Sequence, residues 1–492
     1  MPVSNLTAES PWPVWQSLTR RPVLFTVCPA LVVAFGLPLA FALPFAPAFV
    51  MTFPLVLCLG CMLWRPAAAL PLALFVGPLV NIQFELGLEE KTASFDKLLL
   101  VVIVGAWALR KVCLRDRNVP QDSLLVLWWS WLAVLGVTVA LTRTHLGNQL
   151  WFMAEQLSYL LFFAICLDVL RDPLALRASV QAIVASGWVV VLLGMGNWVG
   201  RMVGLGGIPL TYPSTDEWLY SFVSTIGQPN FYSAYQILCI PVAVWIFWNS
   251  HGARRWLFGF LVLLQVASVI RAQSFGGGVG LMVAALVAWL LGGGRNWKRA
   301  ACVFAAVILL VAVWALKARD TKWFDRSFVI RAHILSVSKH IFAERPLFGH
   351  GLSSFTRIFP DYETVYARER LVGELGQWRA FPRSISSHNW FLRLGVEGGL
   401  ASLLAFLALI GWVIVSRWSS LRSPPLGIQK RDGFLALDCW SFRLALMASL
   451  TGFVFQAVTE ELFAYSKVVL VFWALTAVGV ILDKRTGGQN AR

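Results

Sequence analysis

The chain has 492 residues, of which 58% are hydrophobic and 13% are charged, and its formal net charge is +16. Soluble domains usually carry about 25% charged residues, so this composition, with a mean hydropathy of +0.70, excludes an ordinary soluble protein and predicts one membrane domain. The excess of positive charge fits a nucleic acid, an anionic substrate or cytoplasmic loops, and its location along the chain must decide among them.

Apolar runs that could cross a bilayer follow one another along most of the chain. A transmembrane helix needs about 20 apolar residues, with about 17 as the lower limit. Several runs are short or contain proline, so pairs of them could form re-entrant hairpins and reduce the count. We therefore expect an all-α polytopic integral membrane protein of twelve to fourteen transmembrane helices, at 23–41, 46–64, 66–83, 97–113, 123–142, 150–170, 177–198, 230–249, 255–270, 276–292, 299–317, 390–416, 441–459 and 466–483.

Basic residues alternate between successive connections of these helices. If the N-terminus is cytoplasmic, the even-numbered connections carry most of the Lys and Arg, and the short odd-numbered ones carry few. The positive-inside rule then places both termini in the cytoplasm of a multi-pass inner-membrane protein. It places three connections outside, at 200–229, 271–275 and 318–389, and these should meet at one face.

The longest connection, residues 318–389, is the outer loop. It separates the transmembrane helices of residues 1–317 from the C-terminal helices and cytoplasmic tail of residues 390–492. It holds eleven basic and seven acidic side chains. Loops longer than about 60 residues escape the positive-inside rule, so a basic exported loop predicts an anionic partner such as phosphate or a lipid headgroup, and no nucleic acid is expected.

Residues 327–344 of the outer loop carry an apolar stripe at helical spacing. The stripe predicts an amphipathic helix that lies on the membrane face and is ended by Pro346. Arg331 lies beside the stripe, and a guanidinium suits a diphosphate because it donates two parallel hydrogen bonds. The alternative is that the basic groups only form the solvated face of a surface helix. The stripe consists of Ile330, Ile334, Val337 and Ile341.

A histidine stands where the outer loop meets the next transmembrane helix. Residues 386–390 read Ser-Ser-His-Asn-Trp, with serines available for capping and the tryptophan at headgroup depth. The partial positive charge of a helix N-terminus should keep His388 neutral, which is the form that a general base requires. A capping or interfacial histidine is the alternative.

Polar residues continue into that helix and recur at other outer helix ends. Asn389, Arg393 and Glu397 follow at intervals of four, so they share one face. Charge inside a membrane is costly and suggests function, although Arg393 and Glu397 could simply pair with each other to position the helix. Four other polar residues have open roles, for which packing or an interface is favoured over catalysis: Glu155, Gln156, Glu460 and Glu461.

Familiar motifs of nucleotide and metal chemistry are missing from the sequence. There is no phosphate-binding glycine loop, zinc-binding histidine pair or serine elbow, so a nucleotide-driven or metal-dependent enzyme is disfavoured. Cys58 and Cys61 have metal-ligand spacing, but they lie inside an expected helix without a second pair, which favours packing.

Four segments together resemble the O-antigen ligase superfamily, which includes O-antigen ligases, polysaccharide polymerases and bacterial protein O-oligosaccharyltransferases. The segments are 227–230 (Gly-Gln-Pro-Asn), Arg331 followed by 346–351 (Pro-Leu-Phe-Gly-His-Gly), 387–389 (Ser-His-Asn) and 397–400 (Glu-Gly-Gly-Leu). Their order and spacing make the set specific. The resemblance extends from about residue 200 to residue 470.

The resemblance implies a GT-C-like glycosyltransferase of the bacterial inner membrane that needs no metal or cofactor. Such an enzyme moves a glycan from undecaprenyl diphosphate to an acceptor hydroxyl on the periplasmic face, among membrane lipids and without nucleic acid. An O-antigen ligase-like activity is the leading reading, with a polymerase or a protein O-oligosaccharyltransferase as alternatives, so the acceptor is lipid A-core, a glycan or a protein. A lipid-linked oligosaccharide transporter or flippase, or a structural partner in envelope assembly, is an alternative of another class.

The resemblance also implies roles for particular residues. His388 would be the catalytic base, and Arg331 would bind the diphosphate and offset the charge of the leaving group. The family commonly has arginine in a Ser-Arg-Gly step where this chain has phenylalanine at position 275, and Arg271, one helical turn earlier, could supply that charge. The expected substrate-binding residues are Arg271, Asn389, Arg393, Glu397, Asn230 and His350.

Overall fold

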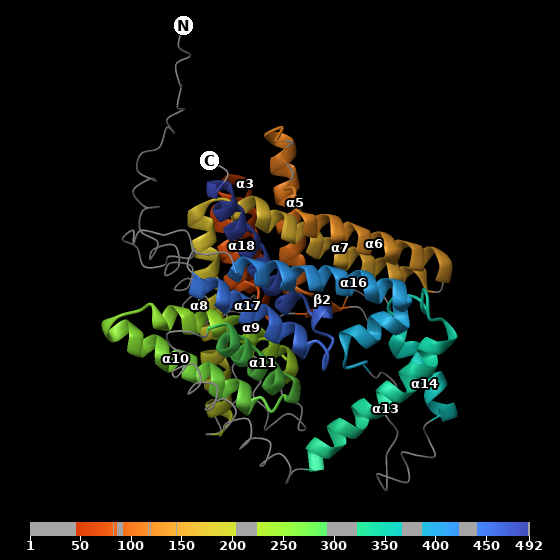
Figure 1. The fold of residues 1–492 in the computed structure, drawn as a ribbon. Helices are drawn as coiled ribbons and strands as arrows, with labels where there is room; N and C mark the ends of the chain where they lie inside the picture. Colours follow the sequence, from red (N-terminus) through yellow and green to blue (C-terminus); the bar gives the residue numbers. More distant parts are fainter. Residues whose placement is uncertain are drawn as a thin grey trace.

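A computed structural model gives the fold of most of the chain (Figure 1). It describes residues 46–81, 83–85, 92–116, 118, 120–143, 145–202, 224–292, 322–366, 386–422 and 440–490. The expected helices at 23–41 and 299–317 lie outside these residues.

Every other expected transmembrane helix corresponds to a helix of the structure. Seven of the described helices are long and apolar enough to cross a membrane. The protein is therefore an all-α polytopic membrane protein. The helices are α3 (Ala46–Trp64), α4 (Pro66–Val76), α5 (Phe95–Cys113), α6 (Ser123–Thr142), α7 (Leu146–Val169), α8 (Pro173–Met202), α9 (Pro229–Trp248), α10 (Gly252–Arg271), α11 (Phe275–Leu291), α16 (Trp390–Arg422), α17 (Trp440–Gln456) and α18 (Ser466–Asn490).

A short β-hairpin lies between α4 and α5 in the described part of the chain. Strands β1 (Gln83–Glu85) and β2 (Thr92–Ser94) pair antiparallel, with Phe84 opposite Ala93. Helix α4 ends at Val76, earlier than the apolar run suggests. Gly77 still has helical backbone and donates to the Ala73 carbonyl, but Pro78 has no N–H to continue the hydrogen-bond ladder.

Helix α18 lies at the centre of the bundle. Almost all of its transmembrane part is buried by protein, as expected for a helix that is apolar on every side. It packs against α7, α9 and α17, and the ring centroids of Trp128 and Trp473 lie 4.0 Å apart where it meets α6. Figure 1 shows α6, α7 and α16 side by side, with α10 and α11 on the other side of the molecule.

The predicted amphipathic helix is present as α13 (Lys322–Glu344), and its apolar stripe packs against protein. Its position on the membrane face stays a prediction. Its apolar residues Ile334, Val337 and Ile341 are buried against Phe355 and against α16. Phe355 begins α14 (Phe355–Tyr366), a helix that the sequence analysis did not predict. Helix α14 supplies the apolar surface that the stripe on α13 requires, so lipid is not needed to cover it.

Candidate functional site

Glu460, just beyond the end of α17, joins three distant parts of the chain. Its side chain is 2% exposed, and its Oε1 atom accepts hydrogen bonds from Arg331 Nη2 at 2.9 Å, Asn230 Nδ2 at 2.5 Å and His388 Nδ1 at 3.2 Å. These donors come from α13, from the start of α9 and from the residues before α16. We call these four residues the Glu460 cluster.

The neighbouring carboxylate, Glu461, holds the segment that carries His388. It accepts hydrogen bonds from the Ser386 hydroxyl at 2.8 Å and from the backbone N–H and the hydroxyl of Ser387, both at 2.6 Å. Arg393 Nη1 donates to it at 2.5 Å. Burial alone would raise the pKa of Glu461, but the charge of Arg393 and the serine hydrogen bonds outweigh burial and lower it.

The backbone around His388 is set by its neighbours. Asn389 precedes α16, and its Oδ1 atom accepts a hydrogen bond from the N–H of Leu392 at 3.0 Å, so Asn389 is the cap of this helix. His388 itself has φ 46, in the left-handed region that few residues other than glycine adopt. This backbone turns the imidazole towards Glu460, and 29% of the side chain stays exposed.

The charge state of His388 is governed by Glu460 rather than by the helix end. Burial lowers the pKa of His388, but the hydrogen bond and the negative charge of Glu460 outweigh burial and raise it above its ordinary value. Arg331 opposes this rise, and Glu461 adds to it. The expectation that the helix N-terminus would depress this pKa is therefore wrong, because a carboxylate in direct contact acts more strongly than a helix dipole.

Arg393 and Glu397 pair with each other, as the alternative interpretation anticipated. Arg393 Nε donates to Glu397 Oε1 at 3.2 Å. The carboxylate of Glu397 is fully buried and also accepts the backbone N–H groups of Ser353 at 2.9 Å and of Phe355 at 3.1 Å. Because these hydrogen bonds occupy both carboxylate oxygens, the structure favours a positioning role for Glu397 over contact with a substrate. Arg393 also connects Glu397 to Glu461.

Two glycine-containing segments interlock beside this pair. Gly399 interrupts the helical backbone of α16 with φ 67, and a Cβ atom there would lie 2.3 Å from the carbonyl carbon of Leu347. Around this break, the Leu400 N–H donates to the Pro346 carbonyl at 2.7 Å, and the Gly351 N–H donates to the Glu397 carbonyl at 2.9 Å. The Pro-Leu-Phe-Gly-His-Gly and Glu-Gly-Gly segments therefore dock through their backbones.

Two expected substrate-binding residues make contacts outside the Glu460 cluster. The ring of His350 bonds through Nε2 to the Ile341 carbonyl of α13 at 2.8 Å. Arg271 ends α10, with its guanidinium 5.4 Å from the centre of the Trp198 ring. Neither is a hydrogen-bond or ion-pair partner of Glu460 or Glu461.

The position of the expected family arginine does lie at the cluster. Phe275 begins α11 directly after Ser274, whose hydroxyl donates to Asn230 Oδ1 at 2.6 Å. Ser274 Oγ also caps α11 by accepting the Gly277 N–H at 3.0 Å. An apolar ring that is 38% exposed therefore occupies this position beside Asn230.

Glu460 and Glu461 are candidate site residues for which the sequence favoured packing or interface roles. Two adjacent acids at the outer end of a transmembrane helix were a signal, but their partners are separated from Glu460 by 72 to 230 residues in the sequence, so no spacing motif could join them. Among the described residues, no group of three or more His, Cys, Asp and Glu side chains is placed to hold a metal ion.

Comparison with known proteins bears on this region. Residues 260–407 match a family model described as O-antigen ligase. The matched stretch contains Arg331 and His388, whereas Asn230 and Glu460 lie outside it. No curated protein matches the chain.

Proposed function

We propose that this member of the O-antigen ligase superfamily, assigned by its domain at residues 260–407, transfers a glycan from undecaprenyl diphosphate to an acceptor hydroxyl at the periplasmic face of the bacterial inner membrane. The observation that carries the proposal is the sharing of Glu460 Oε1 by Arg331 and His388. It places a cation suited to phosphate beside a group suited to proton abstraction.

In the proposed reaction, His388 is the base. With Nδ1 protonated and bound to Glu460, Nε2 is the nitrogen that can accept a proton. It takes the proton of the acceptor hydroxyl, the oxygen attacks the anomeric carbon of the donor, and the bond from that carbon to the diphosphate breaks. The electron pair leaves with undecaprenyl diphosphate, and Glu460 stabilises the imidazolium that forms.

Arg331 is the proposed contact for the leaving diphosphate. A guanidinium has five N–H donors, the ion pair with Glu460 uses Nη2, and 24% of the side chain is exposed. It can therefore meet a phosphate oxygen without releasing Glu460 and offset the negative charge that develops there. Cleavage of the bond between the anomeric carbon and the diphosphate supplies the energy, and the proposed reaction uses no metal ion or cofactor.

We expect Arg331→Lys to weaken donor use even though the charge is kept. An ammonium lacks the planar fork of N–H donors with which a guanidinium can bind a phosphate through two parallel hydrogen bonds, so the donor KM should rise by about tenfold or more. The check is transfer kinetics at varied donor concentration, with Lys339→Met, an exposed change on the same helix, as the control. An unchanged donor KM and kcat in Arg331→Lys would exclude the diphosphate role.

The proposal includes an orientation and a division of the chain. Residues 318–389 would form the periplasmic part between the membrane helices of 1–317 and those of 390–492, with both termini cytoplasmic. The convergence of Arg331, Asn230 and Ser274 supports this orientation, because they lie in or directly beside the three connections that the charge pattern places outside.

Thiol labelling tests the orientation. In a chain without native cysteines, Lys339→Cys on α13 should react with an impermeant thiol reagent added outside spheroplasts, and Arg115→Cys at the end of α5 should not. Both side chains are exposed, so access to the reagent depends on the side of the membrane. Equal labelling of the two variants, with the membrane intact, would overturn the assigned topology.

A further inference from the structure

Lys467 carries a charge in the first turn of α18 that the proposed mechanism does not use. Its side chain is almost completely buried, and burying an ammonium inside a membrane protein is costly, so such a residue is a candidate for a specific task. Lys467 Nζ donates to the Thr225 carbonyl at 2.8 Å and to Asn81 Oδ1 at 3.3 Å. It therefore ties α18 to the segment before α9 and to the segment after α4.

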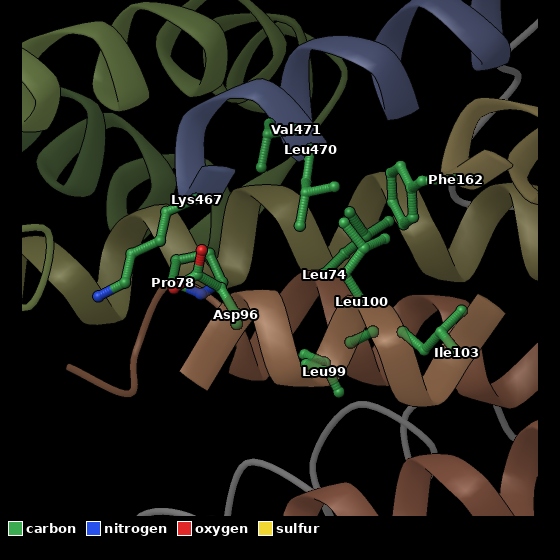
Figure 2. A pocket seen from close by; sticks show the side chains of 12 residues that line it. Leu74, Pro78, Asp96, Leu99, Leu100, Ile103, Phe162, Lys467, Leu470 and Val471 are labelled. Carbon is green, nitrogen blue, oxygen red and sulfur yellow. The ribbon is translucent and has the colours of Figure 1, made fainter. Parts of the chain in front are cut away.

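A small cavity of about 20 Å³ adjoins this charge (Figure 2). Lys467 and Asp96 lie at one end of it, and Leu100 and Phe162 lie towards the other. Asp96 supplies negative charge that acts on Lys467. One carboxylate oxygen of Asp96 contacts the Ser466 hydroxyl, and the other is buried without a hydrogen-bond partner.

The segment that Lys467 holds leads directly into the Glu460 cluster. Thr225 is followed by Ile226, whose carbonyl accepts a hydrogen bond from the Tyr465 hydroxyl. The Tyr465 ring also stacks on Phe231, with centroids 4.3 Å apart. Residues 225–231 are thus fastened to residues 465–467 at three points. These contacts fix Asn230, in the first segment, relative to Glu460, which precedes the second segment in the chain.

We propose that Lys467 is a positioning residue: by binding the Thr225 carbonyl, its ammonium group holds the segment of Asn230 against the segment of Glu460. Asn230 Nδ2 can then share Glu460 Oε1 with His388 and Arg331. A small displacement of a group that positions the reacting residues can lower the rate by about a hundredfold. The inference deepens the proposed function and rests on it.

The test compares three variants of the full-length protein. Lys467→Met should lower kcat about tenfold or more, with donor KM within about twofold, because the diphosphate contact is not touched. Lys467→Met leaves the carboxylate of Asp96 without a compensating charge, and the double variant with Asp96→Asn removes that carboxylate as well. The melting temperature of the double variant should therefore return towards the wild-type value, while kcat stays low. The matched control is Lys97→Met, which removes an ammonium 2.9 Å from Glu155 in the same region of the bundle and should leave kcat unchanged.

A second readout does not depend on glycan transfer. Hydrogen exchange of residues 224–231 should be faster in both Lys467 variants than in the wild type and in Lys97→Met. A wild-type kcat in the double variant would show that Lys467 only balances Asp96 and would overturn the inference, as would unchanged exchange of this segment. Absence of transfer by the wild-type protein would instead contradict the proposed function.

Discussion

Replacing His388 by alanine is expected to reduce glycan transfer by about a hundredfold or more, since this is the typical loss when a general base is removed. The protein should still fold and insert into the membrane, because the outer-loop segment is held mainly by the contacts of Ser386 and Ser387 with Glu461. The measurement is the initial rate of transfer by purified protein at saturating donor.

A second variant separates the loss of the base from a change in the backbone. His388 has a left-handed backbone conformation, which asparagine tolerates better than alanine does. His388→Asn should therefore keep the local structure and lose transfer to the same extent as His388→Ala. Normal transfer by either variant would remove His388 from its catalytic role, and a loss confined to the alanine variant would make it a structural residue.

Replacing Glu460 by glutamine should lower the rate and also change its pH dependence. Glutamine has nearly the same shape but no charge, so Arg331 loses its ion pair and the imidazolium of His388 is no longer stabilised. Loss of the carboxylate that orients a catalytic histidine can cost about 10⁴-fold in kcat in a serine protease, and we expect a loss of at least about tenfold here.

The direction of the pH effect follows from the pKa of His388. In the wild type, Glu460 raises this pKa, and a base works only after it has lost its proton, so kcat/KM should rise as pH passes through the raised pKa. Without the charge of Glu460 the pKa of His388 falls, and the acid limb of the profile should move to lower pH.

Glu363→Gln is the matched control for this pH effect. Glu363 lies 3.2 Å from the Nε2 atom of His333, a histidine–carboxylate pair between α13 and α14 that is outside the Glu460 cluster. Its loss should leave the profile unchanged. An acid limb that stays in place in Glu460→Gln, or moves to higher pH, would contradict the coupling of Glu460 to His388.

The membrane helices could be predicted because their signal is local. Each apolar run that falls in the described residues forms a helix, since a long apolar segment must satisfy its backbone hydrogen bonds internally wherever lipid surrounds it. Helix α14 was missed because it is short and contains Pro360. The surface that covers the stripe on α13 was missed because a stripe shows which face of a helix is apolar but not what packs on that face.

The candidate site, too, could be predicted only where its signal is local in the sequence. His388, Arg331 and the two glycine-containing segments belong to local patterns, so they could be predicted from the sequence. The role of Glu460 depends on donors from three distant segments, which only the folded chain brings together. The direction of the pKa shift of His388 was predicted wrongly, because the prediction considered the partial charge at the end of α16 without the Glu460 carboxylate beside the ring.

Glycan transfer in vitro, by purified protein from an undecaprenyl-diphosphate glycan, measures the proposed activity itself. Lipid A-core, a second lipid-linked repeat and a pilin-like protein would be offered separately as acceptors, to the wild type and to His388→Asn. We predict that the wild type shifts one acceptor in mass by the glycan and releases undecaprenyl diphosphate, and that His388→Asn does neither. Binding of the donor without transfer to any acceptor would contradict the account and favour a transporter of lipid-linked glycans.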